Sequence, residues 1–170
     1  MKTIANKLRE ELKINPELVA DFFVIFSRFE YALKRSGYAG IYRDGETVYP
    51  NWNKYARDIK GKLNMKRDNQ LKEAVEYFKH HPPLRQIVRN NVLDWTKGKD
   101  DAEALSLEEY LVKTLKTVRN NLFHGGKFPN PTGPIHEPSR DEKLLKSCLV
   151  VIDRLLRLHT STGYIFYEFA

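Results

Sequence analysis

The stretch VRNNLFHGGKF, residues 118–128, holds three side chains of types that can act together on a phosphate ester. Arg119 is a permanent cation whose planar guanidinium binds phosphate oxygens in pairs. His124 is the kind of side chain that exchanges a proton near neutral pH. Asn120 precedes it by four residues, so the two side chains can touch if the segment is helical. These types and spacings indicate a candidate site for acid–base chemistry.

Residues 107–123, which precede the histidine, have the apolar periodicity of an α-helix. At about 100° per residue the apolar side chains fall in one narrow sector, which predicts the core face. This face consists of Leu107, Leu111, Leu115, Val118 and Leu122. Phe123 falls outside this sector and needs cover from another helix or from a second copy of the protein. The second option would make the polar side of the helix a dimer interface.

The polar side of the same helix carries the candidate chemistry. Lys116, Asn120 and His124 fall on this side. Arg119 flanks them with a side chain long enough to reach the same ligand. Gly125 is placed to end the helix in a left-handed conformation, and the carbonyl end of the helix dipole favours the protonated imidazole. We therefore expect a histidine that can hold or release a proton near neutral pH.

An arginine followed by a histidine is a weak signal by itself. The segment RLLRLH repeats the spacing with Arg154 and His159, but leucines surround this pair and no asparagine follows the arginine. We interpret Arg154 as a solvated arginine and His159 as an ordinary histidine near a helix end. The stronger signal is the whole string from Arg119 to Lys127, with its asparagine and its two glycines.

The string VRNNLFHGGK resembles the motif of the HEPN superfamily (higher eukaryotes and prokaryotes nucleotide-binding domains), in which an arginine and a polar residue precede a histidine. The resemblance covers residues 118–127, and the helical layout makes it compatible with most of the chain. It implies a helical bundle that dimerises, so that two motifs form one composite site. It also implies a metal-independent endoribonuclease of the kind that acts in toxin–antitoxin, phage-defence or RNA-processing systems.

The resemblance also implies a role for each site residue. A ribose 2′-hydroxyl would attack the adjacent phosphate and leave a 2′,3′-cyclic phosphate and a 5′-hydroxyl. His124 would transfer protons, Arg119 would stabilise the charged transition state, and Asn120 would orient His124 or hold the phosphate. Lys116 and Lys127 are candidate substrate-binding residues, although a solvated position in a loop is the alternative for Lys127.

Two interpretations of Glu30 are open. The ordinary one is a helix ion pair with Lys34, four residues later, which is worth a few tenths of a kcal/mol. In the other, Glu30 reaches across from beside the apolar stripe of its helix and orients the motif. No metal or cofactor is expected, because His80 and His81 are adjacent and point about 100° apart on a helix.

The formal net charge of +7 favours a polyanionic partner such as RNA. A basic cluster either guides RNA or is a solvated face: Lys60, Lys62, Lys66 and Arg67. The single cysteine, Cys148, predicts no internal disulfide and is expected to be buried. No apolar run is long enough to span a bilayer, and the N-terminus lacks the features of a secretion signal. We expect a cytoplasmic protein with no membrane contact.

The expected partners are RNA, a second copy of the chain in a homodimer and, in a toxin–antitoxin system, an antitoxin protein. Two alternatives to the enzyme are open. One is a catalytically inactive HEPN-like module that binds RNA, a nucleotide or a protein partner. The other is an unrelated helical interaction domain in which the motif is a coincidence.

The rest of the sequence predicts a single all-α domain over residues 1–170, a HEPN-like helical bundle of two long helices and several short ones. A helix near residues 21–36 carries a stripe of Phe22, Phe26, Phe29 and Leu33 and stops at Gly37. Further helices are expected at residues 3–14, 51–63, 69–81, 84–95 and 139–160, the last with Ser139 as its N-cap. Loops are expected at residues 37–50, with a short hairpin at Asp44-Gly45, and at 125–138, and the tail 162–170 is expected to be a strand or a loop.

Overall fold

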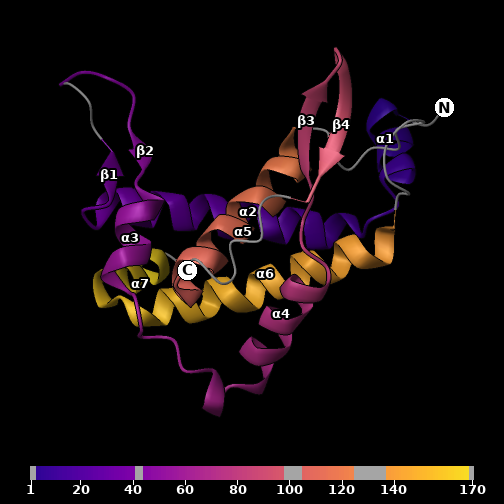
Figure 1. The fold of residues 1–170 in the computed structure, drawn as a ribbon. Coiled ribbons are helices and arrows are strands. Elements are labelled where there is room, and N and C mark those ends of the chain that lie inside the picture. Colours follow the sequence, from indigo (N-terminus) through magenta and orange to yellow (C-terminus); the bar gives the residue numbers. More distant parts are fainter. Residues whose placement is uncertain (1–2, 41–43, 98–104, 125–136, 169–170) are drawn as a thin grey trace.

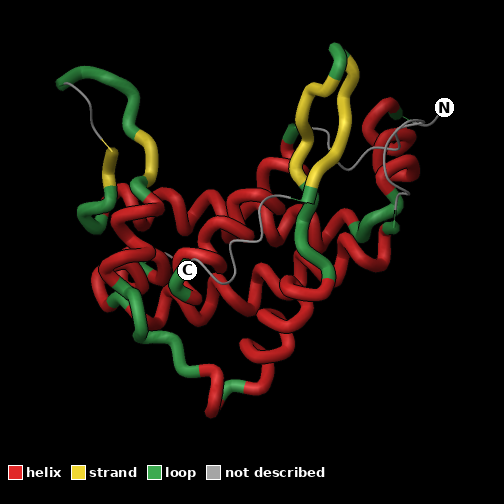
Figure 2. Tube along the Cα trace, viewed as in Figure 1, coloured by secondary structure: helices red, strands yellow, loops and turns green. Residues whose placement is uncertain are grey.

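The computed structural model describes residues 3–40, 44–97, 105–124 and 137–168, which are mostly helical (Figures 1 and 2). Three helices are long, where two were predicted: α2 (Pro16–Arg35), α5 (Leu107–Phe123) and α6 (Pro138–Leu158). The shorter helices are α1 (Ile4–Leu12), α3 (Trp52–Asp58), α4 (Asn69–His80) and α7 (Thr160–Tyr167), with a 3₁₀ turn at Met65–Arg67. None of these helices is long and apolar enough to cross a membrane.

Two small antiparallel sheets accompany the helices, each of two strands. The strands β1 (Ala39–Gly40) and β2 (Tyr49–Pro50) pair within the predicted loop 37–50. The strands β3 (Arg85–Arg89) and β4 (Val92–Thr96) form a longer hairpin that stands out from the helices in Figure 1.

Local sequence sets the ends of the long helices. The Asn15 side chain accepts hydrogen bonds from two backbone N–H groups in the first turn of α2, and Pro16 occupies the first position of this helix. Gly37, with φ of +91°, follows its last turn, as predicted. Ser106 and Glu109 form a reciprocal capping box at the start of α5.

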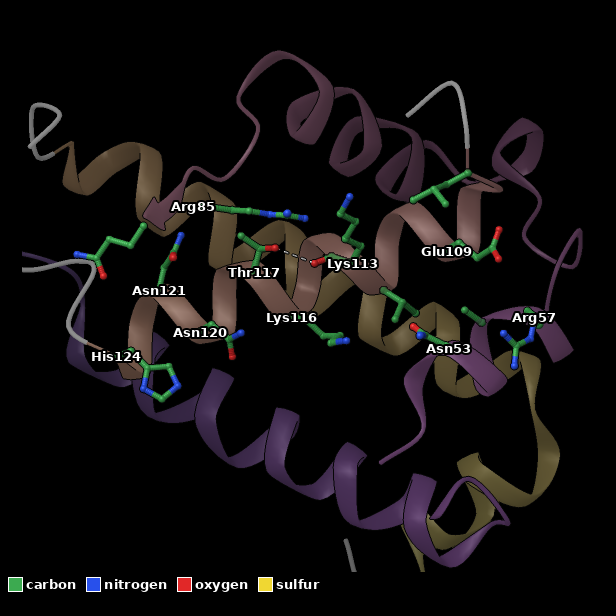
Figure 3. A pocket seen from close by; sticks show the side chains of 14 residues that line it. Asn53, Arg57, Arg85, Glu109, Lys113, Lys116, Thr117, Asn120, Asn121 and His124 are labelled. Atoms are coloured by element: carbon green, nitrogen blue, oxygen red, sulfur yellow. Dashed lines mark hydrogen bonds between the residues drawn. The ribbon is translucent and has the colours of Figure 1, made fainter. Parts of the chain in front are cut away.

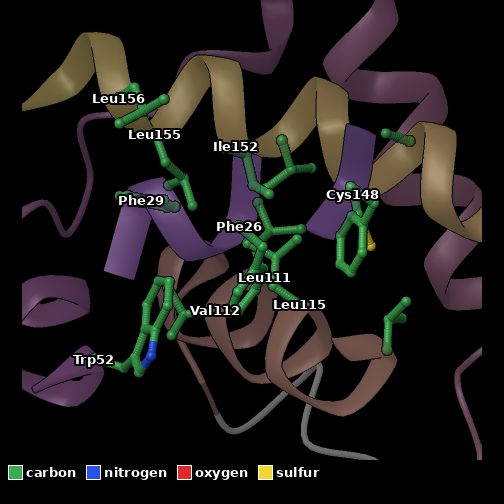
Figure 4. Close-up of a cluster of buried hydrophobic side chains, with 14 of the residues drawn as sticks. Phe26, Phe29, Trp52, Leu111, Val112, Leu115, Cys148, Ile152, Leu155 and Leu156 are labelled. Atoms are coloured by element: carbon green, nitrogen blue, oxygen red, sulfur yellow. The ribbon is translucent and has the colours of Figure 1, made fainter. Parts of the chain in front are cut away.

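The core lies where α2, α5 and α6 meet, with α3 closing one end (Figure 4). The stripe predicted on α2 is confirmed, since Phe22, Phe26, Phe29 and Leu33 are all buried. Cys148 of α6 is buried too, as expected. The Trp52 ring of α3 packs edge-on against the Phe29 ring, with 5.1 Å between centroids. Each fully buried large apolar side chain stabilises the fold by about 1.5–3 kcal/mol.

The predicted core face of α5 is correct at its centre only. Leu111, Leu115 and Val118 are buried, whereas Leu107 and Leu122 are partly buried and pack on the core edge. The buried face also includes neighbouring positions that the helical projection placed outside it: Glu108, Val112, Thr114 and Asn121.

The helix predicted over residues 84–95 is wrong, because this segment is the β3–β4 hairpin. Its turn residues, Asn90 and Asn91, have φ of +51° and +60°. These values suit a type I′ turn, which requires positive φ at both central positions and matches the twist of the strands. Asparagine tolerates this conformation better than most residues.

The expected strand or loop at the C-terminus is also wrong, because residues 160–167 form α7. The guanidinium of Arg28 on α2 donates hydrogen bonds to the carbonyl oxygens of Ile165 (2.7 Å) and Phe166 (3.2 Å). At the other end of α7, the His159 ring accepts a hydrogen bond from the Thr162 N–H. These contacts hold in a helix a segment whose own residues favour strands.

Two smaller corrections concern α6. The helix begins at Pro138, with Glu137 at the N-cap position, so Ser139 lies inside the first turn and is not the cap. Arg154 is not a solvated arginine, because it pairs with Asp68 and with Asp153 and its side chain is only 24% exposed. The contact with Asp68 ties α6 to the start of α4.

Candidate functional site

A pocket of about 710 Å³ lies along the polar side of α5 (Figure 3). Eight residues of α5 and its C-cap line it, and five of these recur at intervals of three or four residues, which places them in one stripe on the helix surface. They are Glu109, Lys113, Lys116, Asn120 and His124. The predicted grouping of Lys116, Asn120 and His124 on one side of the helix is therefore found in the structure.

Side chains from α3 and β3 complete the pocket. Asn53 and Arg57 of α3 lie toward the end that Glu109 occupies (Figure 3). Arg85, the first residue of β3, extends its guanidinium along α5 toward Lys113. Burial lowers the pKa of Lys113, and the nearby positive charge of Arg85 lowers it further.

The lining is strongly cationic. Among the described residues, four lysines and arginines contribute to it, namely Arg57, Arg85, Lys113 and Lys116, against one carboxylate, that of Glu109. The backbone N–H and the hydroxyl of Ser106 both donate hydrogen bonds to Glu109 Oε2, and these bonds lower the pKa of this carboxyl. The pocket therefore carries a fixed negative charge near α3 and an excess of positive charge toward its centre.

Asn121 fixes the base of the hairpin to α5. Its side chain is 9% exposed, and its Nδ2 donates a hydrogen bond to the carbonyl oxygen of Leu84 at 2.7 Å. This bond holds the residue next to Arg85. Asn121 was not among the predicted site residues. The signal that could have identified it is its position beside the core face, because a buried polar side chain needs an internal hydrogen bond.

Arg119 is absent from the pocket lining and points toward α2. Its Nη1 donates a hydrogen bond to Asn120 Oδ1 at 3.1 Å, and its Nη2 lies 3.6 Å from Glu30 Oε2. The structure thus brings Glu30, Arg119 and Asn120 into one chain of contacts that ends at the pocket. Among the described residues Glu30 pairs with Arg119 and forms no ion pair with Lys34, and its role as an orienting residue stays a prediction.

His124 lies at the end of the pocket as the C-cap residue of α5, and it is exposed. Its backbone N–H donates to the Asn120 carbonyl at 2.9 Å. No hydrogen bond joins the side chains of His124 and Asn120 in the part of the chain that the structure describes. The predictions for Gly125 and Lys127 concern residues outside the described ranges.

Phe123 receives part of its cover from α2. Its ring lies edge-on to the Phe23 ring, with 5.3 Å between centroids. Both side chains nevertheless remain exposed, Phe123 by 40% and Phe23 by 51%. An apolar patch of two rings therefore lies next to Arg119, whose guanidinium is 5.5 Å from the Phe123 ring centre.

The predicted basic cluster after α3 does not line this pocket. Its members, Lys60, Lys62, Lys66 and Arg67, are all exposed. Within the described residues, no three side chains of His, Cys, Asp or Glu gather in a way that could hold a metal ion.

Comparison of the chain with protein-family models, with curated proteins and with solved structures finds no match. Any function must therefore be argued from the residues of this pocket and from the motif beside it.

Proposed function

We propose that the protein is a metal-independent endoribonuclease that cleaves RNA by attack of a ribose 2′-hydroxyl. One observation carries the proposal: His124 lies at the end of a pocket lined by four lysine and arginine side chains. Arg119, Asn120 and Glu30 form a connected group next to it. The HEPN resemblance of residues 118–127 suggests the reaction, and the charge of the pocket suits a polyanionic substrate.

The reaction moves one proton from the 2′-hydroxyl to the departing 5′-oxygen, while a P–O2′ bond forms and the P–O5′ bond breaks. His124 is the side chain that can exchange this proton. The phosphorane carries extra negative charge, which Arg119 or Lys116 can stabilise. Arg119 is held by Glu30 and would have to share or leave this carboxylate to reach a phosphate.

We propose further that the active form is a homodimer. Cleavage needs both a base and an acid, and one motif supplies a single histidine, so a second copy would provide the other. The exposed rings of Phe23 and Phe123 adjoin Arg119 and give an apolar surface for this contact. A cytoplasmic toxin of this type would act with an antitoxin protein as its partner.

The test is cleavage of a labelled single-stranded RNA by the purified protein in the presence of EDTA. We expect His124→Ala to reduce the rate by at least about 100-fold, which is the usual contribution of a general acid or base. The fold and the oligomeric state should not change. The matched control is His80→Ala, because this exposed histidine lies outside the pocket and should be dispensable. Undiminished cleavage by His124→Ala would contradict the proposal.

A second candidate function is a catalytically inactive module that binds RNA, a nucleotide or a protein. The observation that favours it is the engagement of Arg119 by Glu30 and Asn120, which leaves the guanidinium turned from the pocket. Such a module would bind RNA without product formation, and Arg119→Ala would weaken binding by removing the partner of Asn120, which lines the pocket. Mass analysis for 2′,3′-cyclic phosphate ends separates this candidate from the enzyme.

A further inference from the structure

We infer that Arg85 and Lys113 form a second phosphate-binding position, the distal phosphate subsite, which places a single RNA strand along α5 from His124. The inference rests on the proposed function for the identity of the ligand, which is RNA. Binding is measured apart from cleavage, so a failure of the subsite can be told from a failure of the proposed function. Neither residue belongs to the motif at residues 118–127. Arg85 comes instead from the β3–β4 hairpin.

The distance along the helix indicates a ligand longer than one nucleotide. At 1.5 Å per residue, Lys113 and His124 are about 16 Å apart along the axis of α5. Lys116 and Asn120 lie between them on the same stripe. An RNA strand whose reacting phosphate lies at His124 would therefore meet Lys113 with a different phosphate of the same strand.

The electrostatics of the distal phosphate subsite favour an anion. The guanidinium of Arg85 extends toward Lys113, and its charge disfavours the protonated form of this lysine (Figure 3). A phosphate placed between the two cations would relieve this repulsion and accept hydrogen bonds from both. Among the described residues of the lining, Glu109 carries a carboxylate, and this carboxylate accepts hydrogen bonds from Ser106 at the start of α5.

The position of Arg85 is built into the fold. The hydrogen bond from Asn121 to the Leu84 carbonyl fixes the residue before it. From Arg85 onward, the strand is paired with β4 in regular register, with Arg85 opposite Thr96. The side chain therefore projects from a fixed backbone, as a positioning residue requires.

The shape of the pocket favours a single strand over a duplex. Its volume of about 710 Å³ falls in the range that encloses small ligands, and it is walled by α3, α5 and β3. An A-form duplex keeps its bases stacked inside and cannot insert them between these walls. The amide side chains of Asn53, Gln86 and Asn120 line the same space and can hydrogen-bond the edges of unstacked bases.

The experiment measures binding without cleavage. A fluorescent RNA oligonucleotide with 2′-O-methyl groups at every ribose has no nucleophile, so its anisotropy reports affinity alone. The variants are Arg85→Gln with Lys113→Gln, together and singly, and the matched control is Arg89→Gln. Arg89 lies on the same strand but outside the pocket lining, and it pairs with Asp94. Thermal unfolding checks that each variant is folded.

We expect the double variant to bind at least about tenfold more weakly, since it loses charge-assisted hydrogen bonds to a phosphate from both side chains. The slope of log affinity against log salt should fall by about 0.7 for each phosphate that the variant no longer neutralises. Arg89→Gln should stay within about twofold of the wild type, because it changes the same charge elsewhere. The RNA duplex of the same sequence should compete poorly.

On a cleavable RNA, the double variant should raise KM and leave kcat close to the wild-type value, which is the mark of binding remote from the reacting atoms. Equal affinity of the double variant and the wild type would overturn the inference, even if cleavage still depends on His124. Equal competition by the duplex would overturn the assignment to a single strand. Weaker binding by the double variant in a protein that never cleaves RNA would refute the proposed function and support the distal phosphate subsite.

Discussion

Replacement of Asn121 by alanine should loosen the β3–β4 hairpin from α5 and lower the stability of the whole fold. The side-chain amide donates a 2.7 Å hydrogen bond to the Leu84 carbonyl, and the residue is 9% exposed. Alanine leaves that carbonyl without this donor at a part-buried site. An unsatisfied buried acceptor costs about 1–3 kcal/mol, which is the expected decrease in the free energy of unfolding.

Two measurements detect this decrease. Urea unfolding followed by circular dichroism gives the free energy directly, and the melting temperature should fall by about 2–4 °C for each kcal/mol in a chain of this size. Amide hydrogen exchange locates the effect, because the protected amides of β3 and β4 should exchange faster relative to those of α6. Weaker binding of the 2′-O-methyl RNA should accompany the change, because Arg85 loses its fixed base.

The neighbouring residue supplies the matched control. Asn120 is exposed and its side chain accepts a hydrogen bond from Arg119. Asn120→Ala should therefore change the free energy of unfolding by no more than about 0.5 kcal/mol, as is usual for exposed positions. It should impair cleavage instead. Equal stability of the two alanine variants, or unchanged exchange in the hairpin of Asn121→Ala, would refute the assignment of Asn121 as its anchor.

Two further predictions concern helix contacts. Gly163→Ala should destabilise the protein, because the added Cβ would lie 2.6 Å from the Leu156 carbonyl oxygen. This effect opposes the preference of a helix for alanine over glycine, which is about 1 kcal/mol. Thermal unfolding measures the change, with Ser161→Ala at an exposed position of the same helix as the control. The hydrogen bond from Arg154 lowers the pKa of Asp68 in the folded protein below its ordinary value of 3.8. The Asp68 carboxylate therefore stabilises the fold at a pH above the unfolded-state pKa of about 3.9. This contribution is lost as the pH falls through the folded-state pKa. Asp68→Asn retains a capping side chain and should lower stability at neutral pH but not in strong acid, as urea unfolding across this range can check. A Gly163→Ala variant as stable as the wild type would contradict the close contact with the Leu156 carbonyl oxygen. A loss of stability in Asp68→Asn that does not vary with pH would contradict the stabilising pairing of Asp68 with Arg154.

Much of the helical core could be predicted from sequence because the signals are local. The spacing from Phe22 to Leu33 identifies one face of a helix, and Asn15-Pro16 and Gly37 mark its ends. The same periodicity placed Lys116, Asn120 and His124 together.

The hairpin was mispredicted because its local pattern is ambiguous. Leu84, Val88 and Val92 recur every four residues, which fits a helix, while Val88 and Leu93 also pair across the strands. The decisive signal was Asn90-Asn91, whose tolerance of positive φ permits the turn. Arg85 was not among the predicted site residues, and it enters the pocket as the first residue of this hairpin.

Other site residues could not be predicted because they depend on contacts between segments far apart in sequence. Arg57 and Arg85 enter the pocket from α3 and β3, and nothing in their own neighbourhoods indicates this. Contact between Glu30 and the motif was one of two open alternatives, and its partner Arg119 was not predicted. The C-terminal helix likewise depends on Arg28, which lies on α2 and binds its last carbonyl groups.

Cys148 makes this core measurable without any engineered label. It is the single cysteine of the chain, and its side chain has no exposed surface where α6 packs against the other long helices (Figure 4). A thiol reagent can modify it only when that packing opens. The rate of modification therefore reports the free energy of opening at the centre of the protein. The same measurement can be made with and without RNA, and at concentrations that favour a single copy or a pair.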